Sequence, residues 1–110
     1  MSEFVFLDRG GTRPESPTEA EKNMERWVRW LQELGTKGHI KDRGQPLEAD
    51  GKVVRGAHAI TDGPYAESKD VVGGYTLVEA KDLAHAAELA GGCPIFANGG
   101  LVEVRPVMQM

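Results

Sequence analysis

The 110-residue chain contains a single cysteine, Cys93, and no long hydrophobic run. One cysteine cannot form a disulfide within the chain, so a disulfide-stabilised fold is excluded. A membrane-spanning helix needs about 20 consecutive apolar residues, and charged residues or glycines interrupt every apolar stretch before that length. The first residues also carry neither the basic region nor the apolar run of an export signal. We therefore expect a cytoplasmic protein with no membrane association.

Positive charge is scarce as well. The 13 lysine and arginine residues are scattered along the chain, and 17 acidic residues bring the net charge to -4. Nucleic-acid-binding proteins gather cations on one face, so we expect no nucleic-acid partner. The three histidines and one cysteine lack the spacing of metal ligands, and the glycine pairs match no phosphate-binding or dinucleotide-binding loop. The sequence therefore predicts no metal site and no cofactor.

No repeat, low-complexity tract or linker divides the chain, so residues 1–110 are expected to form a single domain with its own core. Aromatic and β-branched runs predict strands over 3–8, 71–80 and 101–107, and looser alternation predicts another strand around 52–61. A hairpin turn is predicted at Asp50-Gly51, which would add a further strand pair.

Two segments have the pattern of helices. Ser16, Pro17 and Glu19 are typical of a helix N-terminus, with a cap, a proline at the first helical position and a carboxylate that reaches back. Apolar residues then recur at helical spacing, at Ala20, Met24, Trp27, Val28, Leu31 and Leu34. The second helix is predicted to begin at Asp82 and to end at Gly91-Gly92, with a small apolar face of Leu83, Ala86, Ala87 and Ala90.

The resulting order of elements, βαββαβ, predicts a ferredoxin-like α+β fold. Two helices cover only one face of such a sheet, and a bare apolar sheet face is normally buried against a partner. The simplest closure is a symmetric homodimer.

Residues 62–75, DGPYAESKDVVGGY, combine a tight turn with a phenol and several charges at a strand end. In one interpretation Asp62 only makes the turn, because its carboxylate accepts backbone N–H groups while Pro64 presets φ. In the other it is a rigidly held carboxylate at the mouth of a cleft. Tyr65 is either a half-buried aromatic residue or a donor to a ligand. The neighbouring polar residues are either solvated or ligand contacts, namely Glu67, Ser68 and Lys69.

His58 precedes Asp62 by four residues on the predicted strand, so alternation places the two side chains on one face. Such a pair has the groups for a base and an orienting carboxylate, and the alternative is a surface or interface histidine. Trp27 and Trp30 are interpreted as core or rim packing, and Cys93 as a small buried residue.

Four ordered blocks resemble the DGPF-containing branch of the YCII-related family over nearly the whole chain: DGPYAESK from Asp62, GGYTLVE from Gly73, Cys93-Pro94, and VEVRPV from Val102. Tyr65 stands where the branch name has phenylalanine. The resemblance implies a ferredoxin-like protomer in a dimeric α/β barrel. Members of the family include an enzyme that removes halide from a hydroxylated aromatic ring, and many proteins encoded near extracytoplasmic-function sigma factors.

In the YCII-like branch, a histidine on the first helix and an aspartate before the proline after the second helix are proposed to act as an acid/base pair. Trp27 and Cys93 occupy these positions here, so the resemblance does not carry that mechanism over.

We expect instead a small polar or hydroxy-aromatic ligand in a cleft between the sheet and the DGPY loop of a homodimer. For a cofactor-free elimination or isomerisation, Asp62 or His58 would act as the base and Tyr65 as a donor to the developing oxyanion. Trp27 would form a flat wall for the ligand. The alternative is a non-catalytic interaction module with a partner protein linked to a sigma factor.

Overall fold

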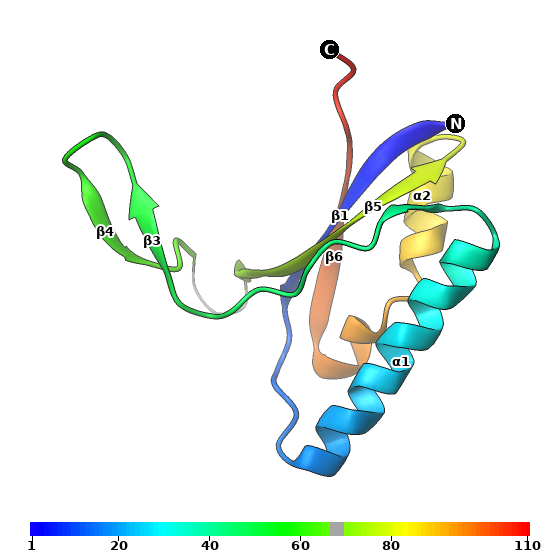
Figure 1. Ribbon diagram of the computed structural model, residues 1–110, viewed down its shortest axis with the longest axis horizontal. Coiled ribbons are helices and arrows are strands. Elements are labelled where there is room, and N and C mark those ends of the chain that lie inside the picture. The colour runs from blue at the N-terminus through cyan, green and yellow to red at the C-terminus, as the bar shows by residue number, and fades with distance from the viewer. Residues whose placement is uncertain (67–69) are drawn as a thin grey trace.

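The computed structural model of the protein describes residues 1–66 and 70–110 and contains a four-stranded antiparallel sheet. The strand order is β2-β5-β1-β6, with α1 and α2 on the same side of the sheet (Figure 1). The elements of this body are β1 (Ser2–Gly10), α1 (Pro17–Thr36), β2 (Ile40–Asp42), β5 (Val72–Ala80), α2 (Leu83–Ala90), the 3-10 helix η2 (Pro94–Asn98) and β6 (Gly100–Pro106). The predicted ferredoxin-like α+β fold is therefore confirmed.

The core lies between the sheet and the two helices. Because successive strand residues point to opposite faces, Phe4 and Phe6 of β1 face the helices together with Val78 of β5. Phe6 stacks on Trp30 of α1, with the ring centroids 6.1 Å apart. The remaining buried apolar residues complete the same cluster, namely Leu34, Ala80, Ala86, Ala90, Cys93 and Ile95.

The serine cap and the first-turn proline of α1 are as predicted, but the buried stripe along the helix is different. The Ser16 hydroxyl accepts a hydrogen bond from the backbone N–H of Glu19, and Pro17 occupies the first turn. Burial is concentrated at Trp30 and Leu34, with Trp27 and Leu31 partly buried; Ala20, Met24 and Val28 are exposed. The first turns of α1 extend past the sheet (Figure 1), so their apolar residues have no sheet to pack on.

Removing the cap of α1 tests how much this local signal contributes to stability. Replacing Ser16 with alanine leaves the N–H of Glu19 without its acceptor, and we expect a loss of about 1 kcal/mol in the free energy of unfolding. Urea titration followed by circular dichroism measures the loss. Thr18→Ala, at an exposed position in the same turn, is the control and is expected to stay within about 0.5 kcal/mol of the wild type. Equal midpoints for the two variants would contradict the prediction.

The second helix and the last strand also follow the sequence. The Asp82 carboxylate accepts a hydrogen bond from the N–H of His85 and caps α2. Pro106 is the last residue of β6, and β6 is an edge strand, so its missing N–H removes no hydrogen bond within the sheet.

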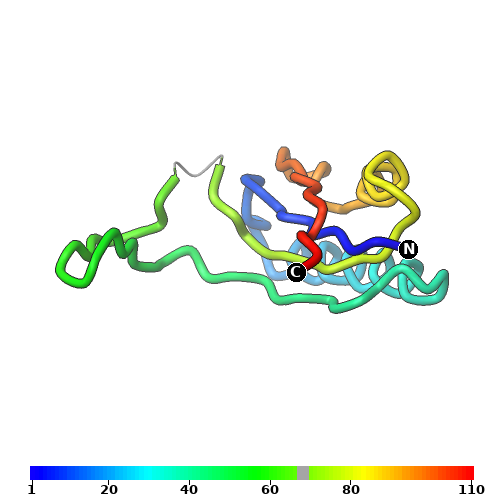
Figure 2. Tube along the Cα trace, turned by 90° about the horizontal axis from the view of Figure 1, so that it is seen from above, coloured from blue at the N-terminus to red at the C-terminus, as the bar shows by residue number. Residues whose placement is uncertain are grey.

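The structure of residues 51–63 differs from the predicted single strand. The single strand expected over 52–61 is two strands, β3 (Gly51–Val54) and β4 (Ile60–Gly63), which form a hairpin with a turn over 55–59. The turn is closed by the N–H of Arg55 donating to the carbonyl of Ala59, so Asp50-Gly51 lies at the base of the hairpin and does not form its turn. We call residues 51–63 the arm, because they project away from the sheet (Figures 1 and 2). No described helix is long and apolar enough to cross a membrane.

Candidate functional site

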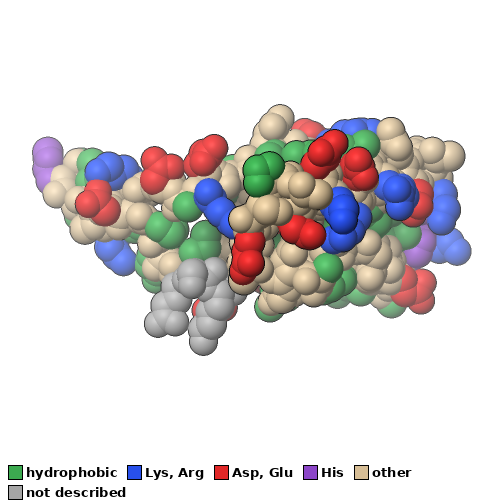
Figure 3. Space-filling view, turned by 90° about the horizontal axis from the view of Figure 1, so that it is seen from below, with side chains coloured by type: hydrophobic (Ala, Val, Ile, Leu, Met, Phe, Trp, Pro, Cys, Tyr) green, Lys and Arg blue, Asp and Glu red, His purple; other side chains and the backbone are tan. Residues whose placement is uncertain are grey.

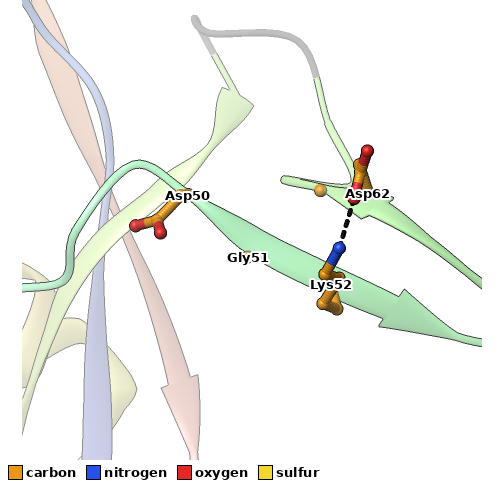
Figure 4. Close-up of a pocket in the computed structure, with 5 residues that line it drawn as sticks. Asp50, Gly51, Lys52 and Asp62 are labelled. Atoms are coloured by element: carbon orange, nitrogen blue, oxygen red, sulfur yellow. Dashed lines mark hydrogen bonds and ion pairs between the residues drawn. The ribbon is translucent and has the colours of Figure 1, made fainter.

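Asp62 lies on β4 and is highly exposed. Its carboxylate forms an ion pair with Lys52 on β3, and its side chain is 88% exposed (Figure 4). Five residues at the base of the arm line an open hollow of about 420 Å³: Asp50, Gly51, Lys52, Asp62 and Gly63. Within the described chain the Asp62 side chain bonds to Lys52 and to no backbone N–H, which argues against the turn-making interpretation. An ion pair this exposed contributes at most about 1 kcal/mol.

The expectation that His58 and Asp62 share a strand is wrong, and the role of His58 as a base stays a prediction. His58 lies in the turn of the arm and not on a strand, so strand alternation does not place it on the same face as Asp62. Tyr65 follows the arm and is 79% exposed, and the guanidinium of Arg55 lies 5.5 Å from the centre of its ring. This contact is within the range of a cation–π interaction. The role of Tyr65 as a donor stays a prediction.

Trp27 packs at the edge of the core. Its ring makes an edge contact with Trp30, with the centroids 5.7 Å apart, and its side chain is partly buried. The role of a flat wall for a ligand therefore stays a prediction. Glu67, Ser68 and Lys69, which the sequence suggested as ligand contacts, lie outside the described residues. The described part of the chain holds no group of three or more metal-ligating side chains.

Asp8 is a buried carboxyl group that the sequence interpretation did not single out. It lies on β1 in phase with Phe4 and Phe6, so its side chain faces the helices and is only 7% exposed. Burial raises the pKa of Asp8 from 3.8 to about 6. A carboxyl with this pKa is populated in both its protonated and its ionised form near neutral pH. The signal that could have found it is an aspartate at an inward position of an otherwise apolar strand.

The glycine pair on β5 makes room for this carboxyl. Gly74 pairs with Asp8 across the sheet, and a side chain at position 74 would begin 3.2 Å from Asp8 Oδ2 and 3.2 Å from the carbonyl oxygen of Gln45. The strand register shifts between Asp8 and Arg9, which leaves Gly73 as an extra residue on β5. Gly73 is thus the bulged residue, and Gly74 allows the close approach of the neighbouring backbone.

Cys93 is the hydrogen-bonding neighbour of Asp8 in the described part of the chain. Its Sγ atom lies 4.0 Å from Asp8 Oδ1, where a thiol is a weak donor. Burial, together with the charge of Asp8, raises the pKa of the Cys93 thiol to about 12, so the thiol stays protonated. Cys93 is buried as predicted. The family resemblance implied an aspartate at position 93, which is Cys93 here. A carboxyl group nevertheless lies beside this position, and it belongs to Asp8 of β1.

The nearest cation in sequence does not neutralise Asp8. Arg9 points to the opposite face of the sheet, where its Nε atom lies 2.8 Å from Glu103 Oε1 and its Nη1 atom donates to the carbonyl of Asp70. Within residues 1–66 and 70–110, Asp8 takes part in no ion pair. Among the described residues no cation stabilises the ionised form of Asp8, while burial disfavours it. This combination raises the pKa of a carboxyl group.

The fold and the four sequence blocks between Asp62 and Val107 place the protein in a known class. The chain belongs to the YCII-related domain family, whose model matches residues 6–110. A search of curated proteins gave no match. Among solved structures, the chain is similar to 5-chloro-2-hydroxyhydroquinone dehydrochlorinase from Burkholderia phenoliruptrix, in complex with 2,5-dihydroxybenzoquinone. The TM-score is 0.52 at 21% sequence identity, over 96% of this chain and 95% of the other, and this likeness concerns the fold.

Proposed function

We propose that this protein binds a small hydroxy-aromatic or similarly polar molecule beside Asp8 and transfers a proton on it without a cofactor, as a homodimer. The observation that carries the proposal is the Asp8 carboxyl, which is buried among apolar residues with a pKa of about 6. Perturbed carboxyl groups of this kind are concentrated at functional sites. A general base works best when its pKa lies near the operating pH.

The chemistry follows from what an ionised carboxyl can do in a site with little water. The Asp8 carboxylate takes a proton from the bound molecule, and the electron pair left behind either expels a leaving group or returns to a proton at another carbon. The first course is an elimination and the second an isomerisation. Neither course needs an oxidant or a reductant.

Two further observations support the proposal. The fold is similar to that of a dehydrochlorinase whose structure holds a hydroxylated quinone. The homodimer is supported by the sheet face opposite the helices, which carries the half-buried apolar residues Val5, Leu7, Tyr75 and Leu77 with no element of the described chain packed over them. A sheet face of this composition is normally covered by a partner.

The proposal is tested first with a panel of phenols, catechols and small carboxylates. A ligand at a hundred times its Kd adds about 2.7 kcal/mol to the stability of the folded protein, which raises Tm by about 10 °C. Compounds that raise Tm are then assayed for turnover by absorbance and by NMR. No shift with any compound would count against a small-molecule site and favour the interaction module.

Turnover of a bound compound then tests Asp8 itself. We expect Asp8→Asn to lower kcat at least about 100-fold, because the amide cannot take the proton. Wild-type activity should rise as the pH passes through about 6 and then level off, since the base acts in its ionised form. Asp62→Asn is the comparison for the exposed carboxylate. Wild-type turnover in the Asp8→Asn variant would refute the assignment of the base.

A further inference from the structure

A second hollow lies on the body of the protein, where α1 begins. Its volume is about 270 Å³, and it is lined by residues 12–15 between β1 and α1, by Glu19, Asn23 and Arg26 on α1, and by Asn98 at the end of η2. Pockets that hold a whole drug-sized ligand measure about 300 to 1,000 Å³. The hollow therefore has room for one end of a small molecule.

Hydrogen bonds fix the segments around this hollow. The N–H of Thr12 donates to the carbonyl of Asn98 over 2.9 Å, and the side-chain amide of Asn98 donates to Asn23 Oδ1 over 3.1 Å. Asn23 uses its amide oxygen in this bond, so its amide nitrogen can donate to a ligand. The loop after β1, the helix α1 and the 3-10 helix η2 are thus held together before a ligand binds, and little ordering is needed on binding.

The hollow carries charges of both signs in equal number. Arg13 and Arg26 bring guanidinium groups to its wall, and Glu15 and Glu19 bring carboxylates. Within residues 1–66 and 70–110, none of these four side chains takes part in an ion pair. Seen from this end of the molecule, acidic and basic side chains lie near one another on the body (Figure 3). A simple anion would be attracted by one pair and repelled by the other, whereas a zwitterion is attracted by both.

The hollow lies beyond Asp8 along the same two elements. β1 and α1 run in opposite directions (Figure 1), and Phe6 of β1 stacks on Trp30 of α1. Asp8 comes two residues after Phe6, about 7 Å further along the strand, and Trp27 comes about one turn before Trp30 on the helix. The same direction along α1 leads to Asn23 and the hollow. A molecule whose ring lies beside Asp8 and Trp27 therefore points one end toward the hollow.

We propose that the hollow binds the charged end of a hydroxy-aromatic amino acid whose ring lies beside Asp8. The position of the ring rests on the proposed function, whereas the charged end is assigned from the hollow alone. Arg26 and the amide nitrogen of Asn23 bind the carboxylate, and Glu19 binds the ammonium group. These three side chains lie on one side of α1, because they follow one another at intervals of four and three residues. The hollow thus selects the class of substrate, and Asp8 acts on the other end of the molecule.

Three probes that share a phenol ring test the charge preference. Tyrosine carries both charges, hydroxyphenylpropanoate carries only the carboxylate, and tyramine carries only the ammonium group. NMR titration of isotope-labelled protein gives the Kd of each probe and follows the side-chain amide signal of Asn23. The charged side chains of the hollow are exposed, so we expect each charged contact to change the Kd by about fivefold. Tyrosine should therefore bind more tightly than either of the other probes, and it should shift the Asn23 signal.

Two neutral substitutions separate the two charged contacts. Arg26→Gln should abolish the preference for tyrosine over tyramine, and Glu19→Gln should abolish the preference for tyrosine over hydroxyphenylpropanoate. Both positions are exposed and outside the core, so both variants are expected to fold. Arg29→Gln and Glu25→Gln are the matched controls, because they make the same changes of charge at exposed positions of α1 outside the hollow. We expect them to leave every Kd near the wild-type value.

The outcomes separate this inference from the proposed function. Equal binding of the three probes, or the same effect in Arg26→Gln and Arg29→Gln, would overturn the hollow as a selective site, and the turnover assay on Asp8→Asn would still decide the chemistry of that carboxyl. If no probe binds, the hollow is overturned as well, while the panel of phenols, catechols and carboxylates still decides the small-molecule site. If tyrosine binds as expected and no compound is turned over, the hollow stands and the proton transfer at Asp8 is refuted.

Discussion

Replacing Asp8 with asparagine is expected to make the protein more stable at pH 8, with a gain over the wild type that disappears in acid. The pKa of Asp8 is raised from 3.8 to about 6 in the folded protein, so ionising this carboxyl costs on the order of 3 kcal/mol. Asparagine has nearly the same shape and carries no charge. Allowing for an amide N–H without a good partner, we expect a net gain of about 2 kcal/mol at pH 8, or about 8 °C in Tm.

The sign of the pH dependence follows from the two pKa values. The folded protein binds the proton of Asp8 more tightly than the unfolded chain does. This proton therefore stabilises the fold fully below about pH 3.8, and the contribution is lost as the pH rises through about 6. The asparagine variant lacks this term, so the difference in Tm between the two proteins should grow between pH 4 and pH 8.

Thermal unfolding at several pH values measures this difference. Asp50→Asn is the matched control, because Asp50 is exposed and the same chemical change there should alter stability by no more than about 0.5 kcal/mol at any pH. If the Asp8 and Asp50 variants followed the wild type in parallel from pH 4 to pH 8, the raised pKa of Asp8 would be refuted.

The second large effect is expected at Gly44, which lies beside β5. A Cβ atom at this position would overlap the carbonyl oxygen of Tyr75, and the backbone is left-handed with φ of +70°. Alanine there has to displace a backbone group, because the contact is not with a movable side chain. We expect Gly44→Ala to destabilise the protein by about 3 kcal/mol or more.

Gly38 supplies the control for this effect. Its φ is +80°, and a Cβ atom there would meet nothing within 4 Å. Gly38→Ala should therefore lower the free energy of unfolding by only about 1 kcal/mol, because alanine is disfavoured in the left-handed conformation. The two variants are compared by Tm and by urea titration. A similar loss in both would show that the contact with β5 has little effect.

Position 44 matters because the chain after β2 continues along the edge of the sheet. Three hydrogen bonds hold this segment to β5. The Thr76 hydroxyl donates to the carbonyl of Arg43, the N–H of Tyr75 donates to the carbonyl of Gln45, and the N–H of Leu47 donates to the carbonyl of Gly73. This segment runs past Gly74, close to the carboxyl of Asp8, before it enters the arm. A change at Gly44 is thus expected to disturb both the edge of the sheet and the surroundings of Asp8.

The predicted stability gain at Asp8 also bears on function. A carboxyl group that destabilises the fold at neutral pH is typical of functional sites, where stability is commonly exchanged for activity. The combination of higher Tm and lower turnover in Asp8→Asn would identify such an exchange. A higher Tm with unchanged turnover would leave Asp8 as a structural residue only.

The sequence by itself determined the elements that depend on near neighbours. The caps at Ser16 and Asp82, the strands around Phe4 and Val78 and the end of β6 at Pro106 all follow from residues within a few positions of one another. From these elements the ferredoxin-like order could be predicted. The membership of the YCII-related family was visible in the ordered blocks between Asp62 and Val107.

Only the tertiary structure decided which residues are buried or brought together. Alternation puts Asp8 on the inward face of β1, but its pKa is raised by burial, and the residues beside its carboxyl include Gly74 of β5 and Cys93, which is 85 residues away. The exposed turns of α1 depend on where the sheet ends, and His58 lies in a turn that interrupts the strand expected to hold both His58 and Asp62. Local sequence sets backbone conformation, whereas burial and electrostatics depend on residues that only the fold places in contact.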